Sequence, residues 1–312
     1  MIERKVAIIT GANAGVGFAI VQRLVAESPD PLTVILACRN KTRAQEALNK
    51  LHRIRDQYRR IDYLFCNAGV LPSAGIMWGK LLVDLFVAPM DLVIRSDVLV
   101  QPKQHLTEDG IGNVLACNVF GHYLMIKGLE DLMSKTEEDP GRVIWTSSMT
   151  AEKGSFSNDD WQGLNSKQPY ESSKWVTDLL AIRLNEVWAG QHSGNTSPKL
   201  HIISIATQPG VVASGIGGLA FWIVMLRTAL HYVVRFLGER NQTITGYHGA
   251  YSNVHAALQR PLEKLDYRCK YGSSCGRTGQ EFLKVERVVE YEESQALVVV
   301  GELEKLRLSF TS

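Results

Sequence analysis

The sequence contains few cysteines, and their spacing excludes the common zinc and redox motifs. Five cysteines occur in 312 residues, with no CxxC pair and no Cys/His spacing typical of a zinc site. We therefore interpret them as buried thiols of a reducing compartment and expect no metal site. The cysteines are Cys38, Cys66, Cys117, Cys269 and Cys275.

An excess of charge of either sign is also absent. The chain has 34 lysines and arginines against 32 acidic residues, a net charge of +2. This balance gives no electrostatic reason to expect nucleic acid as a partner. Hydrophobic residues make up 45% and charged residues 21% of the chain. That composition is ordinary for globular proteins and excludes intrinsic disorder, a collagen-like repeat and a small disulfide scaffold.

The sequence lacks an uninterrupted apolar run of the roughly 20 residues that a membrane-spanning helix needs. The longest candidate, Ile216–Leu237, is interrupted by Arg227, His231 and Arg235, which fall on one stripe of a helix. Two interpretations are open. In the first, the segment lies in a membrane interface or forms a lid over a substrate mouth. In the second, it covers a substrate pocket with its basic face in water. The apolar stretch 81–100 is a second piece for the same surface.

Short β-branched runs alternate with helical patterns, as in βαβ units. The predicted strands are 6–10, 32–38, 62–66, 142–146 and 201–206, and the helical segments are 16–26, 44–58, 111–133 and 170–187, with a further helical pattern near 285–306. Because the strand runs are almost continuously apolar, we expect an α/β fold with a doubly wound, Rossmann-type parallel sheet. No linker divides the chain, so 1–312 is predicted to be one domain, with an apolar insertion near 74–105 and an apolar segment near 214–240.

A glycine-rich turn follows the first predicted strand and precedes a helix. Glycines allow a tight turn and close backbone approach, and the helix N-terminus offers N–H groups to a pyrophosphate. The segment therefore predicts a dinucleotide site formed by Thr10, Gly11, Asn13, Gly15, Val16 and Gly17. The second strand leads into Arg39, and an arginine at this place accommodates the 2′-phosphate of NADP rather than the free ribose of NAD.

Polar residues that fit carbonyl reduction follow in order along the chain. Tyr170 and Lys174 lie one turn apart on a predicted helix, where the lysine charge would stabilise the tyrosinate formed when Tyr170 gives up its proton. Ser148 follows a buried strand, so its hydroxyl is expected at the carboxyl edge of the sheet, where open α/β sheets bind ligands. Asn118 lies in another predicted helix. The set predicts hydride transfer to a carbonyl oxygen that the serine polarises and the tyrosine protonates.

These motifs, taken together, resemble the ordered motif set of the short-chain dehydrogenase/reductases. The set comprises Thr10–Gly17, Asn67-Ala68-Gly69, Asn118, Ser148, Tyr170–Lys174 and Pro209-Gly210. Within that superfamily, the segments 37–40, 118–122, 144–148 and 168–174 are similar to the 3-keto-steroid reductases of sterol biosynthesis, also called type 7 17β-hydroxysteroid dehydrogenases. The long interval between Ser148 and Tyr170 and the insertion after Gly69 are similar to that family too.

The resemblance implies an NADPH-dependent enzyme that reduces the C3 ketone of a sterol to a 3β-hydroxyl after C4 demethylation, with 17-ketosteroids as a further substrate class. By position, Ser148 would bind the carbonyl, Tyr170 would donate the proton, Lys174 would lower the tyrosine pKa and Asn118 would hold a relay water. The cofactor would contact the glycine loop, Arg39, Asn67, Ala68, Gly69, Tyr170, Lys174, Pro209 and Gly210. The resemblance also implies the cytoplasmic face of the endoplasmic reticulum membrane and other sterol-biosynthesis enzymes as partners. A cytoplasmic location and a homo-oligomer stay open.

The sequence departs from the family between Arg39 and Asp62. This interval has room for one amphipathic helix, whereas the family has a further βα unit whose aspartate binds the adenine. We therefore expect a sheet that lacks one βα unit at its edge. Two alternatives to the sterol reductase follow. One is a weakly active or inactive variant that serves as a binding subunit of a sterol-enzyme complex, and the other is a reductase of a retinoid or another lipid ketone.

Overall fold

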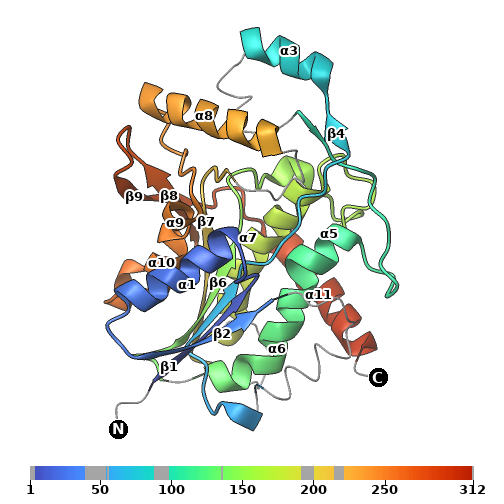
Figure 1. Ribbon diagram of the computed structural model, residues 1–312. Helices are drawn as coiled ribbons and strands as arrows, with labels where there is room; N and C mark the ends of the chain where they lie inside the picture. Colours follow the sequence, from blue (N-terminus) through green and yellow to red (C-terminus); the bar gives the residue numbers. More distant parts are fainter. Residues whose placement is uncertain are drawn as a thin grey trace.

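A computed structural model describes residues 4–38, 54, 56–87, 98–134, 136–190, 200–213 and 221–310. Its centre is a seven-stranded sheet with the strand order β2-β1-β3-β6-β7-β8-β9 (Figure 1). The strands are β1 (Lys5–Thr10), β2 (Leu32–Ala37), β3 (Tyr63–Cys66), β6 (Gly141–Thr146), β7 (Ile202–Gln208), β8 (Cys269–Cys275) and β9 (Glu281–Arg287). All neighbouring pairs are parallel except β8 and β9. The doubly wound, Rossmann-type fold expected from the sequence is therefore confirmed.

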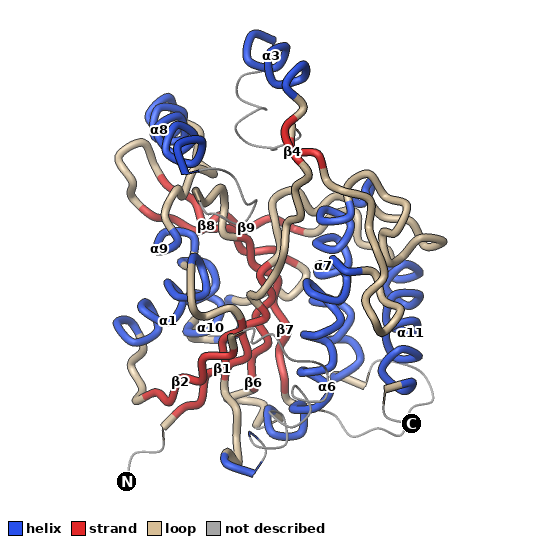
Figure 2. Tube along the Cα trace, turned by 45° about the vertical axis from the view of Figure 1, so that its right-hand side comes forward, coloured by secondary structure: helices blue, strands red, loops and turns tan. Residues whose placement is uncertain are grey.

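Helices cover both faces of the sheet (Figure 2). The longer ones are α1 (Gly15–Glu27), α3 (Trp78–Val87), α6 (Gly121–Met133), α7 (Pro169–Trp188), α8 (Phe221–Leu237), α10 (Tyr251–Leu258) and α11 (Glu293–Ser309). The short ones are α5 (Asn113–Leu115), a π-helical turn at Ala116–Phe120 and α9 (Gly246–Gly249). Helices α1 and α10 pack on one face, and α6, α7 and α11 pack on the other.

Side chains that alternate along each strand form the hydrophobic clusters on the two faces of the sheet. Ile8 of β1 belongs to the hydrophobic cluster under α6 and α7, and its neighbour Ile9 belongs to the cluster under α1 and α10. Both side chains are fully buried, because successive residues of a strand point to opposite faces and both faces are covered. This double burial explains why the strand runs are almost continuously apolar.

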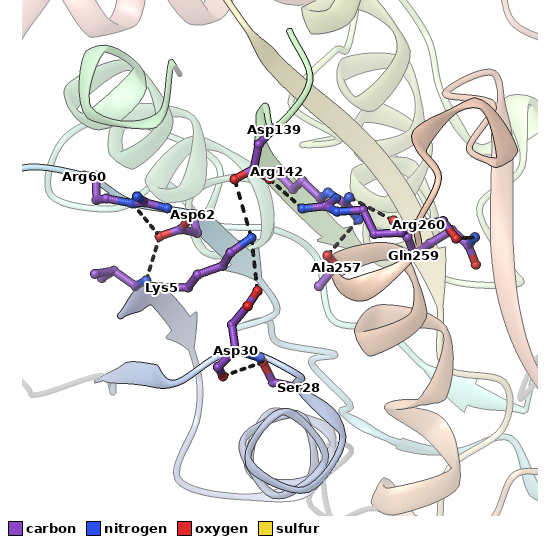
Figure 3. A network of polar contacts seen from close by, with 11 residues as sticks. Lys5, Ser28, Asp30, Arg60, Asp62, Asp139, Arg142, Ala257, Gln259 and Arg260 are labelled. Carbon is purple, nitrogen blue, oxygen red and sulfur yellow. Dashed lines mark hydrogen bonds and ion pairs between the residues drawn. The ribbon is translucent and has the colours of Figure 1, made fainter. Parts of the chain in front are cut away.

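A network of polar contacts lies at the amino ends of the strands (Figure 3). Asp62, which directly precedes β3, accepts a hydrogen bond of 2.7 Å from the Val6 N–H of β1 and is paired with Arg60. The fully buried Arg142 of β6 donates to three carbonyl oxygens at the end of α10, those of residues 256, 257 and 259. These bonds satisfy carbonyls that a helix leaves free at its C-terminus.

Strand β2 is the outermost strand on its side of the sheet in the described part of the chain, where it pairs only with β1. Its residues are half-buried or exposed, unlike the fully buried β3 and β6. Most of the interval in which a further βα unit is predicted to be absent, between Arg39 and Asp62, lies outside the described residues. Most of the predicted helix 44–58 lies outside the described residues.

The C-terminal tail differs from the sequence prediction. Residues 281–287 form strand β9, paired with β8, and the helix begins only at Glu293 rather than near 285. Strand β8 has no apolar run to indicate it, because its centre is Gly272-Ser273-Ser274. The Ser273 hydroxyl is nevertheless fully buried and lies 2.8 and 2.9 Å from the Gly249 carbonyl and the Ser252 hydroxyl. Tertiary hydrogen bonds therefore outweigh the low strand propensity of these residues.

Two apolar helices lie at the opposite end of the molecule from the N-terminus, beyond the carboxyl ends of the strands (Figure 1). Helix α3 exposes Phe86 at 83%, and α8 exposes Phe236 at 71%. The insertion that carries α3 is held by a short antiparallel pair, β4 (Gly75–Ile76) and β5 (Leu99–Val100). No helix in the described ranges is long and apolar enough to span a membrane.

Helix α8 turns its basic stripe toward the protein. His231 is buried, and Arg227 and Arg235 are half-buried, whereas Val233 and Phe236 are exposed. The interpretation that the basic face lies in water is therefore wrong. The reason is that this stripe packs against the protein, where His231 lies close to Gln242 and Arg235 lies close to Cys275. Burial lowers the pKa of His231 to about 4.

Candidate active site

The glycine loop is tied to the end of β3 through Thr10. The Thr10 hydroxyl accepts hydrogen bonds from the backbone N–H groups of Asn67 and Ala68 at 2.8 and 2.9 Å. The Asn67 side-chain amide returns a hydrogen bond of 3.0 Å to the Thr10 carbonyl. Two segments predicted to contact a cofactor, 10–17 and 67–69, are thereby joined at the carboxyl edge of the sheet.

The loop has the backbone that a phosphate group requires. A Cβ atom on Gly17 would lie 2.2 Å from the Gly11 carbonyl oxygen, so only glycine fits there. Gly11 and Gly15 have φ angles of +66° and +54°, in the left-handed region that glycine adopts without strain. The N-cap of α1 is Ala14, which gives no side-chain cap, and the first turn contains no acidic residue. The first N–H groups of α1 therefore suit an external anion.

The other predicted cofactor residues have different positions. Asn13 is exposed at the tip of the loop, and Val16 is half-buried against the core under α1. Arg39 lies outside the described residues. Gly210 has a φ of +69°, and a Cβ atom there would lie 2.6 Å from the Asn241 carbonyl oxygen. The turn at Pro209-Gly210 follows β7 and is held by a hydrogen bond of 2.8 Å from the Thr243 hydroxyl to the Pro209 carbonyl.

Ser148, Tyr170 and Lys174 lie together, as predicted. The Ser148 side chain lies close enough to the Tyr170 hydroxyl to lower its pKa. The Lys174 ammonium lies 5.6 Å from the centroid of the Tyr170 ring and donates a hydrogen bond of 2.8 Å to the Thr146 carbonyl. The Ser148 hydroxyl in turn accepts a hydrogen bond from the Thr150 N–H at 3.1 Å. Helix α7 and the end of β6 thus bring a hydroxyl pair and one ammonium group to the same place.

Burial shifts both titratable groups of this trio. It raises the pKa of Tyr170 to about 12, an effect that the neighbouring Ser148 side chain opposes and the nearby Glu171 carboxylate reinforces. It lowers the pKa of Lys174 to about 8, which the carboxylate of Asp178 opposes. At neutral pH the tyrosine is therefore a protonated donor and the lysine is mainly charged.

Asn118 lies in the π-helical turn at Ala116–Phe120, a distortion that is frequent at functional sites. Its side-chain oxygen accepts a hydrogen bond of 2.8 Å from the Val70 N–H, and its side-chain N–H group donates one of 2.9 Å to the Ser173 hydroxyl. A Cβ atom on Gly69 would lie 3.1 Å from the same oxygen and 3.8 Å from the Lys174 ammonium. Asn118 therefore joins the loop after β3 to α7, and its water-holding role remains a prediction.

Sequence reasoning assigned no role to His122, although this residue lies inside a quoted motif. It is buried on α6, with Nδ1 3.1 Å from the Asn118 carbonyl oxygen and Nε2 3.0 Å from the Thr10 hydroxyl. Since a carbonyl only accepts, Nδ1 carries the proton. Nε2 is then an acceptor that shares the single Thr10 hydroxyl hydrogen with the Phe65 carbonyl, which lies 3.0 Å from the same hydroxyl. The ring is neutral, because burial lowers the pKa of His122 to about 4.

Two further residues at the site, Lys270 and Asp178, were also not predicted from the sequence. Lys270 of β8 donates to the Ser148 carbonyl at 3.0 Å and to the Asp178 carboxylate at 2.7 Å. Asp178 lies one helical turn beyond Lys174, a spacing that would have indicated it. Lys270 has no local motif and is brought to Ser148 only by the pairing of β7 with β8.

The chain is similar to known proteins over most of its length. A family model described as short chain dehydrogenase matches residues 5–215. The chain is similar to the 3-keto-steroid reductase/17-beta-hydroxysteroid dehydrogenase 7 of Rattus norvegicus, with 31% identity over 91% of this chain and 90% of the rat protein. It is also similar to the 3-keto-steroid reductase erg27 of Schizosaccharomyces pombe, with 27% identity over 96% of each chain.

Solved structures share the fold. The KRED1-Pglu enzyme matches with a TM-score of 0.50 and 19% identity over 85% of this chain and 99% of that enzyme. A small-chain dehydrogenase in complex with NADPH matches with a TM-score of 0.50 and 15% identity over 83% of this chain and 94% of its own. At these identities the two structures support the architecture.

Proposed function

The chain belongs to the short-chain dehydrogenase family and is a nicotinamide-dependent oxidoreductase that acts on a ketone, and we propose that this ketone is the C3 carbonyl of a sterol. The observation that carries the proposal is the convergence of Ser148, Tyr170 and Lys174 beside the glycine loop. The substrate class is supported by the similarity, over most of the chain, to proteins named 3-keto-steroid reductase.

The residues of the site suit carbonyl reduction. The Ser148 and Tyr170 hydroxyls, which lie close to each other, would both donate to the carbonyl oxygen and fix it. Tyr170 would then transfer its proton to that oxygen, and the charge of Lys174 would stabilise the tyrosinate that remains. The cofactor, when bound, supplies the hydride to the carbonyl carbon. The products are a secondary alcohol, here a 3β-hydroxyl, and the oxidised cofactor.

NADP is the cofactor that we propose. The glycine loop and the uncapped start of α1 fit a dinucleotide of either kind, whereas the choice between NAD and NADP rests on Arg39, the predicted partner of the 2′-phosphate. One structural neighbour was solved with NADPH. The variant Arg39→Ala should weaken NADPH binding by about tenfold or more and leave NADH binding almost unchanged, since one charge-assisted contact is worth about 1.5–3 kcal/mol.

We also propose that α3 and α8 contact the cytoplasmic face of the endoplasmic reticulum membrane. Both helices expose large apolar side chains beyond the carboxyl end of the sheet, the edge at which the site lies. A sterol is dissolved in the membrane, so an apolar surface beside the site would receive it directly. Other sterol-biosynthesis enzymes are the proposed neighbours on that membrane.

A direct assay tests the reductase. Purified full-length protein is titrated with NADPH, and NADPH oxidation is then followed with a 4-demethylated 3-ketosterol, a 17-ketosteroid and a retinal in detergent micelles. We expect binding, turnover with the 3-ketosterol and loss of at least about 100-fold of kcat in Tyr170→Phe. Undiminished turnover in that variant would remove Tyr170 from the mechanism, and preference for retinal would change the substrate class.

A second candidate function is a binding subunit without turnover. It is favoured by the sequence between Arg39 and Asp62, which has room for one helix where the family has a further βα unit that helps to bind adenine. The NADPH titration separates the two candidates. An enzyme changes the fluorescence of NADPH on binding, and a subunit that has lost the adenine wall does not.

A further inference from the structure

A buried ion pair lies behind the catalytic trio. The Lys270 ammonium of β8 donates to the Asp178 carboxylate of α7 at 2.7 Å and to the Ser148 carbonyl at 3.0 Å. The Asp178 side chain is fully buried, and that of Lys270 is 12% exposed. Because Tyr170, Lys174 and Asp178 are spaced by one helical turn each, all three lie on one face of α7. The pair therefore contacts the site from both the helix and the sheet.

Stability alone does not account for this pair. Taking two charges out of water costs several kcal/mol per ion, and apolar residues of similar volume are often at least as stable. The second carboxylate oxygen of Asp178 has no hydrogen-bond partner among the described residues, so the burial is not fully compensated. What the pair does contact is the backbone of Ser148 and, through charge, Lys174.

We propose that Lys270 and Asp178 are positioning residues of the reductase: Lys270 fixes the backbone that carries the Ser148 hydroxyl, and the pair keeps the electrostatic surroundings of Lys174 balanced. The inference rests on the proposed function, since Ser148 and Lys174 have their catalytic roles only there. Neither residue of the pair touches the reacting atoms.

The charges of Lys270 and Asp178 predict in which direction the titration of Lys174 shifts when either charge is removed. The charged or titratable groups around Lys174 are Tyr170, Glu171 and Asp178 on its own helix, the neutral His122 on α6 and Lys270 on β8. Removing Lys270 leaves the Asp178 carboxylate unopposed, so Lys174 keeps its proton to higher pH. Removing the Asp178 charge leaves Lys270 unopposed, so Lys174 loses its proton at lower pH. The two changes act in opposite directions.

The variants are Lys270→Met, Asp178→Asn and the double variant, with Lys284→Met as the control. Lys284 is also a paired lysine, but it lies on the neighbouring strand β9 and is 42% exposed. The first readout is the pH titration of Lys174, followed by the NMR signal of lysine labelled at Cε and assigned with Lys174→Met. We expect shifts of about half a pH unit or more, upward in Lys270→Met and downward in Asp178→Asn. The double variant and the control should titrate close to the unchanged protein.

The second readout is kinetic and reports on Ser148. Lys270→Met and the double variant should lose about tenfold in kcat with little change in NADPH affinity, because a charge-assisted hydrogen bond to the Ser148 backbone is lost. Lys270→Arg should restore kcat, since it keeps both the charge and the donor. The alkaline limb of the kcat profile should move as the Lys174 titration does.

The outcomes separate this inference from the proposed function. If the unchanged protein binds NADPH and reduces no 3-ketosterol, the substrate proposal fails, and the Lys174 titration still decides whether the pair acts on that residue. Shifts in the same direction, or no shift in either single variant, would overturn the electrostatic role. Unchanged kcat in Lys270→Met would overturn the positioning role. Where a single variant does not fold, the test uses the other two variants. In the double variant Lys174 must titrate at the same pH as in the unchanged protein and kcat must fall, whereas in Lys270→Arg both the titration and kcat must stay unchanged.

Discussion

His122 Nε2 lies 3.0 Å from the Thr10 hydroxyl, so a neutral histidine connects the glycine loop to α6. The same ring donates through Nδ1 to the Asn118 carbonyl at 3.1 Å. The Thr10 oxygen already accepts two backbone N–H groups, so it has no lone pair for a protonated ring. The contact that His122 makes between the cofactor loop and the π-helical turn therefore requires a neutral ring.

This relationship predicts a loss of stability in acid. The pKa of His122 is lowered from 6.5 to about 4 by burial, so the unfolded chain takes up a proton between these values that the folded chain does not. The contribution is fully present above pH 6.5 and decreases as the pH falls toward 4. Between pH 7 and pH 5 it amounts to about 2 kcal/mol of the free energy of unfolding.

Denaturant unfolding of the unchanged protein and of His122→Asn at pH 7 and pH 5 measures this contribution. The variant should be less stable at pH 7 but should lose about 2 kcal/mol less on acidification. The buried His231 is present in both proteins, so its titration cancels. Equal losses in the two proteins would mean that His122 already carries its proton in the folded state.

The glycine loop gives a second prediction. In Gly17→Ala the new methyl group would lie 2.2 Å from the Gly11 carbonyl oxygen and 2.6 Å from the Asn67 amide nitrogen, so the loop must move. Because the loop is the predicted phosphate site, NADPH affinity in a fluorescence titration should fall by at least about tenfold, or 1.4 kcal/mol. Gly301→Ala on α11, where a Cβ atom meets nothing within 4 Å, is the matched control. It should leave affinity unchanged and stabilise the protein by up to about 1 kcal/mol.

The outward apolar face of α8 gives a third prediction. Val233 and Phe236 are 55% and 71% exposed, so replacing both by glutamate should change the free energy of unfolding by less than about 0.5 kcal/mol per site. The same double variant should bind phosphatidylcholine–phosphatidylserine vesicles at least about fivefold more weakly in a flotation assay. The substitutions remove apolar area that would be buried in the membrane and add negative charge, which the anionic vesicles repel. Val25→Glu on α1, which is 69% exposed, is the control. Equal vesicle binding by both variants would exclude α8 as the membrane contact.

The catalytic edge of the sheet could be predicted because its signals are local. Thr10 ends an apolar strand, and Asn67 and Ser148 follow two others. Parallel strands end at one edge, so strand order alone brings these residues close together. Tyr170 and Lys174 are one turn apart on a single helix. None of these relationships depends on which helix packs against which.

The features that the sequence did not reveal depend on tertiary contacts. One of the two interpretations of α8 placed its basic stripe in water, yet His231 is buried beside Gln242, a residue that no helical pattern connects with it. Strand β8 is stabilised through buried serine hydroxyls rather than through an apolar run. Lys270 reaches Ser148 through the register of β7 with β8, and register cannot be read from a polar strand.

The last prediction concerns α11, which packs along α7 and encloses the core on that face. Leu303 is fully buried and belongs to the same hydrophobic cluster as Trp175 and Leu179 of α7. The Trp175 indole also donates to the Gln295 side chain at 3.2 Å. Leu303→Ala should therefore lower the free energy of unfolding by about 2–5 kcal/mol, whereas Leu308→Ala, at an exposed position of the same helix, should change it by less than about 0.5 kcal/mol.

Denaturant unfolding followed by tryptophan fluorescence and by circular dichroism measures both variants. Because α7 carries Tyr170 and Lys174 as well as the α11 contact, the loss in Leu303→Ala should appear in one transition that is common to both probes and to NADPH release. A separate early transition of the helix signal, with NADPH still bound, would show that α11 unfolds independently of the catalytic core. In that case the expectation that 1–312 forms a single domain would be wrong, and Leu303 would stabilise only its own helix.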